Sequence, residues 1–272
     1  MSVNFDISGR VAVITGGAGI LCSEMARHLG IAGCRVAILD LNGDKAVEIA
    51  EGINTAGGTA IGVKANVLDK GDLEKAKEVV LAHFGRVDIL INGAGGNKAA
   101  ATTGPDMNFF DVPADALQWV FNLNFIGTVL TTQVFGKVMT EQEEGCIINI
   151  SSMASIRPLT KVVAYGGAKA AINNFTQWMA VYMNQNFSTK IRVNAIAPGF
   201  LLTEQNRYLM TDKLTGEDSP RGKSVKQHTP MGRYGEPEEL IGAILWLASD
   251  AASFVNGIVI PIDGGFSAFS GV

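Results

Sequence analysis

Tyr165 and Lys169 are the two residues whose types and spacing point most directly to chemistry. They stand four apart in VAYGGAKAAINNFTQWMAVYM, a stretch with the pattern of a helix. Residues four apart lie on one helix face, and a lysine ammonium near a phenol favours the phenolate and lowers the tyrosine pKa. The pair therefore predicts a general acid/base. The spacing alone is common, however, and also fits a surface tyrosine with a lysine nearby.

Ser152 lies thirteen residues before Tyr165, just after the apolar run CIINIS. In an open parallel sheet, ligands bind beyond the carboxyl ends of the strands. Asn92 and the pair Pro198-Gly199 follow apolar runs in the same way. A purely structural interpretation does not explain why these residues all fall at strand ends.

A glycine-rich turn follows the first apolar run, in the stretch TGGAGILC from Thr15 to Cys22. From Gly17 it reads G-x-G-x-x-C, where a dinucleotide-binding fingerprint has glycine in the last place. The glycines let the backbone turn tightly and approach a pyrophosphate at a helix N-terminus. We expect Cys22, a small residue that tolerates burial, to replace the last glycine in packing. Taken alone, the stretch also fits an ordinary turn between a strand and a helix.

Asp40 ends the second apolar run, about 20 residues after the glycine turn. An acidic residue there accepts hydrogen bonds from a ribose and repels a 2′-phosphate, so the sequence favours NAD over NADP. The alternative is that Asp40 caps the helix that follows, at 43–55.

The elements that position these residues alternate between strand and helix. Short β-branched runs predict strands at 10–15, 35–40, 59–64, 87–92, 146–151, 191–196 and 257–262. Amphipathic segments predict helices at 43–55, 70–84, 115–140, 163–185 and 237–248. This alternation indicates an α/β fold, a doubly wound parallel sheet with helices on both faces. No linker or repeat interrupts it, so we expect one domain over 1–272.

The stretch 204–230 departs from this alternation, because it is polar, mixed in charge and without clean periodicity. It fits a solvated loop about as well as an active-site lid. The second interpretation has support because long insertions in compact domains are often functional.

Composition excludes several other classes of protein. The net charge is −4 and no basic patch stands out, so we expect neither nucleic acid nor a membrane as partner. No apolar run is long enough to span a membrane, and the first residues do not resemble a signal peptide. The three cysteines and three histidines are scattered, so we expect no disulfide framework and no metal site. These features are typical of a cytoplasmic protein.

Together the motifs resemble the short-chain dehydrogenase/reductase family, and the resemblance covers essentially the whole chain. The motifs that carry it are TGGAGI (15–20), Asp40, NGAG (92–95), NFIG (124–127), Ser152, YGGAK (165–169), PGFLLT (198–203) and DGG (263–265). The resemblance implies a single-domain Rossmann fold with a seven-stranded sheet, and an NAD(P)-dependent enzyme that interconverts alcohols and carbonyls.

The resemblance also implies a role for each matching residue. Tyr165 exchanges a proton with the substrate oxygen, Lys169 lowers the tyrosine pKa and holds the nicotinamide ribose, and Ser152 hydrogen-bonds the substrate oxygen. Asn124 keeps a water that links Lys169 to solvent. The residues expected at the cofactor, besides Tyr165 and Lys169, are Gly16, Gly17, Gly19, Ile20, Leu21, Asp40, Leu41, Asn66, Val67, Asn92, Ala94, Gly95, Pro198, Gly199, Leu201 and Thr203.

The chain departs from the usual family patterns at three places. Ile20 and Cys22 stand at the two later glycine positions of T-G-x-x-x-G-x-G, and Gly19 lies one place early. The usual N-N-A-G reads N-G-A-G, with Gly93 in the second place. Asn66 replaces the acid expected at the adenine, where an amide can still form a hydrogen bond.

Three stretches resemble the branch of the family that acts on sugar acids. They are the variant glycine loop, NGAGGN (92–97) with the following ATT (101–103), and LTEQNR (202–207). The resemblance implies that the substrates are D-mannonate and D-fructuronate, with NAD as cofactor. A carboxylate substrate needs a fixed cation, for which Arg207 is the candidate, although a solvated lid arginine fits equally well. The candidates for binding hydroxyls are Asn97, Lys98, Gln205 and Asn206.

Other functions fit parts of the same sequence. A gluconate or polyol dehydrogenase would use the same catalytic residues, whereas ketoacyl reduction on a carrier protein usually needs NADPH and a basic patch. A nucleotide sensor without chemistry predicts losses at Ser152, Tyr165 or Lys169, and the chain has none. The apolar segments 115–140 and 163–185 resemble helices that pair between subunits in this family, which implies a homotetramer. Packing on the sheet alone is the alternative.

Overall fold

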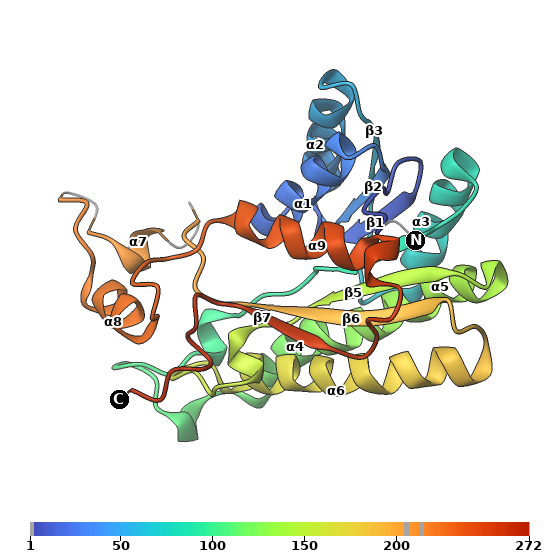
Figure 1. The fold of residues 1–272 in the computed structure, drawn as a ribbon. Coiled ribbons are helices and arrows are strands. Elements are labelled where there is room, and N and C mark those ends of the chain that lie inside the picture. The colour runs from blue at the N-terminus through green and yellow to red at the C-terminus, as the bar shows by residue number, and fades with distance from the viewer. Residues whose placement is uncertain (1–2, 204–206, 213–214, 272) are drawn as a thin grey trace.

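The computed structural model describes residues 3–203, 207–212 and 215–271. Parallel strands form one seven-stranded sheet in the order β3-β2-β1-β4-β5-β6-β7 (Figure 1). The chain adds strands first on one side of β1 and then on the other, so the sheet is doubly wound, which confirms the prediction. The strands are β1 (Val11–Thr15), β2 (Arg35–Asp40), β3 (Thr59–Lys64), β4 (Ile89–Asn92), β5 (Gly145–Ile150), β6 (Ile191–Pro198) and β7 (Val259–Ile262).

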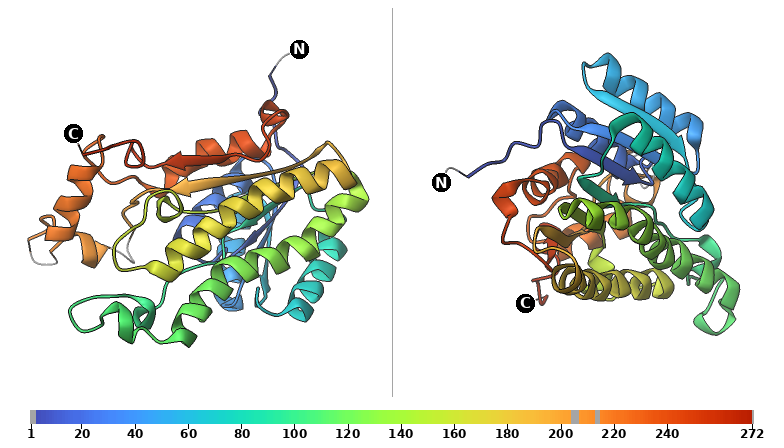
Figure 2. Two further views of the ribbon diagram at one scale, coloured as in Figure 1. Left: turned by 90° about the horizontal axis from the view of Figure 1, so that it is seen from below. Right: turned by 90° about the vertical axis from the view of Figure 1, so that its right-hand side faces the viewer.

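Helices cover both faces of the sheet (Figure 2). One face carries α1 (Ile20–Ile31), α2 (Gly43–Thr55) and α9 (Ile241–Ala248), and the other carries α3 (Lys70–Phe84), α5 (Gly127–Gln142) and α6 (Val163–Asn186). The central strands are buried between these layers, which explains why their sequences are continuously apolar. Short 3₁₀ turns occupy Ala99–Ala101, Phe109–Asp111, Met153–Ser155, Pro237–Leu240 and Asp250–Ala252. No helix in the described part of the chain is both long and apolar enough to cross a membrane.

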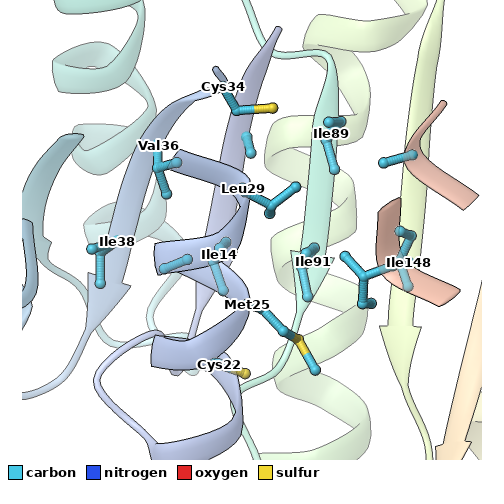
Figure 3. Packing of buried hydrophobic residues seen from close by; sticks show 14 of the residues in the cluster. Ile14, Cys22, Met25, Leu29, Cys34, Val36, Ile38, Ile89, Ile91 and Ile148 are labelled. Carbon is cyan, nitrogen blue, oxygen red and sulfur yellow. The ribbon is translucent and has the colours of Figure 1, made fainter. Parts of the chain in front are cut away.

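Helix α1, which directly follows the glycine turn in the chain, packs on the sheet (Figure 3). Met25 and Leu29 are fully buried and lie over Ile14, Ile91 and Ile148, which belong to three neighbouring strands. Burial of each such side chain stabilises the folded state by about 1.5–3 kcal/mol relative to leaving it exposed to water. This packing fixes the direction of the N-terminus of α1, and therefore the place where a phosphate would bind.

The segment predicted as a helix over 115–140 is helical throughout and contains a turn of a different type. Helix α4 (Ala114–Phe121) leads into a π-helical turn at Asn122–Ile126, and α5 follows. The side-chain amide of Asn124 donates to the carbonyl of Val120 at 2.7 Å inside this turn. The prediction of a helix over 115–140 is confirmed, and the structure adds a π turn within it, a feature that often marks a functional site.

The described parts of 204–230 contain two helices, α7 (Arg207–Met210) and α8 (Pro220–His228), which lie beyond the end of β6 (Figure 1). Met210 and Val225 are buried against Tyr234. The stretch is therefore a small helical unit with apolar contacts of its own, and not a solvated loop alone. Its role as a lid stays a prediction.

Candidate active site

A pocket of about 350 Å³ lies at the carboxyl ends of the strands. The glycine turn, Asp40, Ser152 just after β5, and the predicted catalytic residues of α6 meet in this pocket. Its wall is formed by Gly16, Gly19, Ile20, Leu21, Cys22, Asp40, Gly93, Gly95, Gly96, Ile150, Ser151, Ser152, Tyr165, Lys169, Pro198 and Gly199.

The glycine turn has no room for side chains where it meets its neighbours. Gly16 has a φ of +62°, and a Cβ there would lie 2.7 Å from Cα of Ala94. A Cβ at Gly17 would lie 2.7 Å from Cγ2 of Ile38. Gly19 precedes α1 without a side-chain cap, so the N–H groups of the first helical turn have no side-chain acceptor. Such an uncapped helix start beside glycines suits a pyrophosphate.

Cys22 stands where the fingerprint has its last glycine, and its side chain is buried beside the loop after β4. A Cβ added to Gly93 would lie only 2.2 Å from the Cys22 sulfur. Burial raises the pKa of Cys22 to about 12, which keeps the thiol protonated and unreactive. Cys22 is therefore a packing residue, as the sequence predicts.

Asp40 connects the end of β2 to the glycine turn. Its Oδ2 accepts the N–H of Ala18 at 3.0 Å, and its Oδ1 accepts the N–H of Asn42 at 2.9 Å. The cap of α2 is Asn42, whose Oδ1 accepts the N–H of Lys45 at 3.2 Å, so Asp40 is not the helix cap. A carboxylate has lone pairs beyond these two bonds, and Asp40 lines the pocket where ribose hydroxyls can donate to it.

Lys169 is buried in the wall of the pocket. Its Nζ donates to the carbonyl of Ile150, at the end of β5, at 2.7 Å. The same Nζ lies 5.6 Å from the centre of the Tyr165 ring. Burial lowers the pKa of Lys169 to about 8, because it disfavours the charged ammonium. A lysine with this pKa can take up and release a proton near neutral pH.

Tyr165 lies one turn before Lys169 on α6 and lines the same pocket as Ser152. Burial raises the pKa of Tyr165, and its hydrogen bond with Ser152 acts in the opposite direction. The predicted lowering by Lys169 is not seen in the structure, because the ammonium is directed at the Ile150 carbonyl. The Ser152 hydroxyl also accepts the N–H of Ala154 at 3.2 Å, which fixes its position.

A hydrogen-bond network behind Ser152 does not follow from the sequence motifs. Ser151 Oγ donates to Oδ1 of Asn173 at 2.5 Å, and Nδ2 of Asn173 donates to Ser155 Oγ at 2.8 Å. Ser155 Oγ donates in turn to the backbone carbonyl of Ser152 at 2.5 Å. Asn173 follows Lys169 by four residues on α6 and therefore lies on the same helix face as Tyr165 and Lys169. This spacing is the signal in the sequence that could have identified Asn173.

Asn124 holds the loop that follows β4. Its Oδ1 accepts the N–H of Gly96 at 3.1 Å, and its Nδ2 donates to the Gly96 carbonyl at 2.7 Å. A Cβ at Gly95 would lie 2.6 Å from Oδ1 of Asn124 and 3.3 Å from Nζ of Lys169, so glycine is needed there. Asn124 therefore positions the pocket wall beside Lys169. Its predicted role in holding a water stays a prediction.

Asn92 lies beneath the pocket and not in its wall. The side chain is buried, and its Nδ2 donates to Thr132 Oγ1 at 3.0 Å and to Asn149 Oδ1 at 2.8 Å. These bonds join β4 to β5 and α5. The residue supports the edge of the sheet from which the loop at Gly93 begins.

The other predicted cofactor residues do not form the wall of this pocket. Leu41 is exposed directly after Asp40, and Val67 is buried. Gly199, which does form part of the wall, has no room for a side chain, because a Cβ there would lie 2.6 Å from Cα of Asp263. The chain after β6 therefore packs closely on the chain after β7. The cofactor residues outside the wall, besides Asn92, are Gly17, Leu41, Asn66, Val67, Ala94, Leu201 and Thr203.

Three of the predicted substrate residues, Asn97, Lys98 and Arg207, also lie outside the pocket wall. Nδ2 of Asn97 donates to Thr102 Oγ1 at 2.8 Å, and the Lys98 ammonium lies 5.4 Å from the centre of the Trp119 ring. Arg207 is exposed at the start of α7. Two further candidates, Gln205 and Asn206, lie outside the described residues. Across residues 3–203, 207–212 and 215–271 there is no group of three His, Cys, Asp or Glu side chains that could hold a metal ion.

The chain is similar to known oxidoreductases along almost its whole length. A family model described as enoyl-(acyl carrier protein) reductase matches residues 18–267. UxuB of Bacillus subtilis (strain 168), an uncharacterised oxidoreductase, is 49% identical, and the match covers 98% of each chain. The 5-keto-D-gluconate 5-reductase of Escherichia coli (strain K12) is 31% identical, and the match covers 96% of each chain.

One solved structure is similar in both sequence and fold. It is a crystal structure, with bound NAD, of a Haemophilus influenzae protein provisionally assigned as a D-mannonate oxidoreductase. The two chains are 46% identical, the TM-score is 0.92, and the match covers 98% of each chain.

Proposed function

Since the chain belongs to the short-chain dehydrogenase/reductase family, whose members are oxidoreductases of alcohol and ketone groups, we propose that it is an NAD-dependent dehydrogenase of sugar acids. The proposed reaction interconverts D-mannonate and D-fructuronate. The observation that carries the proposal is the convergence of Ser152, Tyr165 and Lys169 in the pocket that also contains the glycine turn and Asp40.

The proposed chemistry divides an alcohol's hydrogen atoms between two acceptors. In the oxidation direction, the hydroxyl proton passes to the oxygen of Tyr165 in its deprotonated form as the carbon gives up a hydride. When bound, the nicotinamide of NAD⁺ supplies the acceptor for that hydride. Ser152 donates a hydrogen bond to the substrate oxygen and stabilises the charge that develops there. Lys169, with a pKa of about 8, carries the proton onward from Tyr165.

The preference for NAD rests on Asp40. Its carboxylate lines the pocket and would repel the 2′-phosphate of NADP. The related Haemophilus protein binds NAD, which supports the same choice. The glycine turn and the uncapped start of α1 would hold the pyrophosphate shared by both cofactors.

The choice of a sugar-acid substrate rests on the relatives and on one cationic side chain, that of Arg207. The Haemophilus protein is provisionally assigned to D-mannonate, and a more distant relative reduces 5-keto-D-gluconate. We propose Arg207, on α7, as the group that binds the substrate carboxylate. Asn97, Lys98, Gln205 and Asn206 are proposed for the hydroxyls. A gluconate or polyol dehydrogenase is the second candidate, because the same catalytic residues serve it.

The experiment that tests this function is a substrate screen. Purified protein is mixed with hexuronates, aldonates and polyols, with NAD⁺ or NADH and, in parallel, NADP⁺ or NADPH, and absorbance at the nicotinamide band is followed. We expect the highest kcat/KM for D-mannonate with NAD⁺ or D-fructuronate with NADH. Higher kcat/KM for neutral polyols overturns the sugar-acid proposal, and binding of NAD without turnover of any alcohol favours a nucleotide sensor.

We further propose a cytoplasmic homotetramer. Helix α6 exposes Trp178, Val181 and Tyr182, and the rings of Trp178 and Tyr182 stack 4.8 Å apart. An exposed aromatic face of this kind is typical of a subunit interface. Light scattering after size-exclusion chromatography is expected to give four times the mass of one chain, and a monomer would contradict the proposal.

A further inference from the structure

A second pocket, of about 440 Å³, lies at the amino ends of the strands, whereas the candidate active-site pocket lies at their carboxyl ends. Its residues lie at or next to the first residue of several strands, including Arg35 of β2, Gly145 of β5 and Arg192 of β6. Strand β5 has 6 residues, so roughly 20 Å separate this pocket from Ser152. The proposed reaction does not use it.

The second pocket is positively charged, although the whole chain carries −4. Five cationic side chains lie in its wall with three carboxylates, which leaves an excess of two positive charges. Asp88 is already paired with Arg86, which donates to it at 2.6 and 2.8 Å. Asp250 is paired with Arg10. The charges that remain are those of Arg35, Lys190, Arg192 and Glu144.

Arg192 indicates what kind of ligand the pocket takes. The residue is only 7% exposed, and its Nη1 has no hydrogen-bond partner among the described residues. Its Nη2 donates to the carbonyl of Ser249 at 3.2 Å. Its neighbour in register on β5 is Cys146, whose thiol is a weak hydrogen-bond partner of the guanidinium. A buried guanidinium with so weak a partner is unfavourable, and an anion in the pocket would offset its charge, although Nη1 itself is sealed from the pocket.

The arginines of the pocket also bond to carbonyls at helix ends, which is a structural role. Arg10 donates to the carbonyl of Ala248 at 2.8 Å, and Arg35 donates to that of Phe84 at 3.3 Å. A guanidinium has more N–H groups than these bonds use. The same side chains can therefore hold the helix ends and contact a ligand.

We propose that this pocket is a second ligand site, which binds a small polyvalent oxyanion through its phosphate or carboxylate oxygens. Arginine and lysine are the side chains that bind such oxygens. The excess positive charge, to which Arg192 contributes, supplies the attraction. The exposed ammonium of Lys190 and the N–H groups of Arg35 that its bonds to carbonyls do not use supply the donors. Because the two pockets lie at opposite ends of the strands, the oxyanion binds without displacing NAD.

The test measures thermal unfolding of the whole protein with saturating NAD present, so that the glycine turn cannot take up the added anion. Sodium pyrophosphate and sodium citrate are titrated separately, with sodium chloride at the same ionic strength as the reference. The two anions distinguish a phosphate from a carboxylate ligand. The variants are Lys190→Gln, whose side chain is exposed, and Arg192→Met, with Arg27→Gln on α1 as the matched control.

We expect at least one of the two anions to raise the Tm of the wild type and of Arg27→Gln by on the order of 5 °C beyond chloride, at a hundredfold excess over Kd. Lys190→Gln and Arg192→Met are expected to lose most of this increase and to keep the wild-type affinity for NAD. No increase beyond chloride with either anion overturns the proposal. An equal increase in Lys190→Gln and in the wild type overturns it as well, because the anion then binds elsewhere.

Discussion

The sulfur of Cys22 occupies the space that a side chain at Gly93 would need, since a Cβ there would lie 2.2 Å from it. These two residues are two of the places where the chain departs from the usual patterns of its family. The structure shows that the departures belong together: the first turn of α1 gains a side chain where the loop after β4 lacks one. The variant glycine turn is therefore a repacked turn and not a degraded one.

This contact predicts that Gly93→Ala destabilises the protein and weakens NAD binding, because the added methyl group overpacks the site. We expect a loss of about 1–3 kcal/mol in the free energy of unfolding. The double variant Cys22→Gly with Gly93→Ala is expected to recover much of it, and urea unfolding of all four proteins measures the coupling. Gly96→Ala is the control, because a Cβ there meets nothing within 4 Å. Strictly additive effects of the two substitutions would contradict the contact.

Burial of Lys169 predicts a particular dependence of stability on pH. Its pKa falls from 10.5 to about 8, so the folded protein disfavours the charged ammonium by about 3 kcal/mol. This cost is fully present below pH 8 and disappears as pH rises towards 10.5, so the wild type gains stability across that range through this group. Lys169→Met removes the effect.

The measurement is urea unfolding of wild type and Lys169→Met at pH 7.5 and at pH 10. The stability of the variant relative to the wild type is expected to fall by up to about 3 kcal/mol between the two pH values. Lys75→Met, on the exposed side of α3, is the control. A relative stability that does not change with pH would show that the ammonium is not disfavoured by the fold.

Asp40 predicts the choice of cofactor. Asp40→Asn keeps the shape of the side chain but removes the charge near the 2′-phosphate position, so the ratio of kcat/KM for NADP⁺ to that for NAD⁺ is expected to rise at least about tenfold. Asp44→Asn, in the first turn of α2, is the matched control and is expected to leave the ratio unchanged. If Asp40→Asn behaves like the control, the carboxylate does not select the cofactor.

Arg207 predicts how the substrate carboxylate is bound. Arg207→Gln is expected to raise KM for D-mannonate roughly tenfold or more, the effect of losing one charge-assisted hydrogen bond. KM for a neutral polyol is expected to change little. Arg221→Gln on α8 is the control for a general loss of positive charge. Equal increases in KM for both substrates would remove Arg207 from the carboxylate site.

The fold was predictable because each of its helices and strands has a recognisable local pattern of apolar residues. Buried parallel strands are continuously apolar and the helices between them are amphipathic, so element type and order follow from short stretches such as 43–55 and 70–84. Tyr165, Lys169 and Ser152 were also found this way, since helical spacing and a strand end are local features. The π turn around Asn124 was missed, because apolar periodicity distinguishes a helix from a strand and does not identify the type of a single helical turn.

The sequence motifs did not predict which side chains from distant segments contact one another. The bond from Ala18 to Asp40 and the contact of Cys22 with Gly93 depend on how neighbouring strands are paired in register. The network of Ser151, Ser155 and Asn173 depends on the angle at which α6 crosses β5. Such arrangements are set by tertiary packing, which spacing along the chain does not specify.

The measurement that tests the account most directly is the turnover of D-mannonate by Tyr165→Phe. The variant keeps the ring and lacks only the hydroxyl that exchanges the substrate proton. NADH formation from D-mannonate is followed for wild type and variant, and the Kd for NAD is measured for both. The account predicts that kcat falls by at least about 10²-fold. The Kd for NAD is expected to stay within about twofold, because the variant keeps the groups that bind the cofactor. A variant that turns over D-mannonate at the wild-type rate would contradict it.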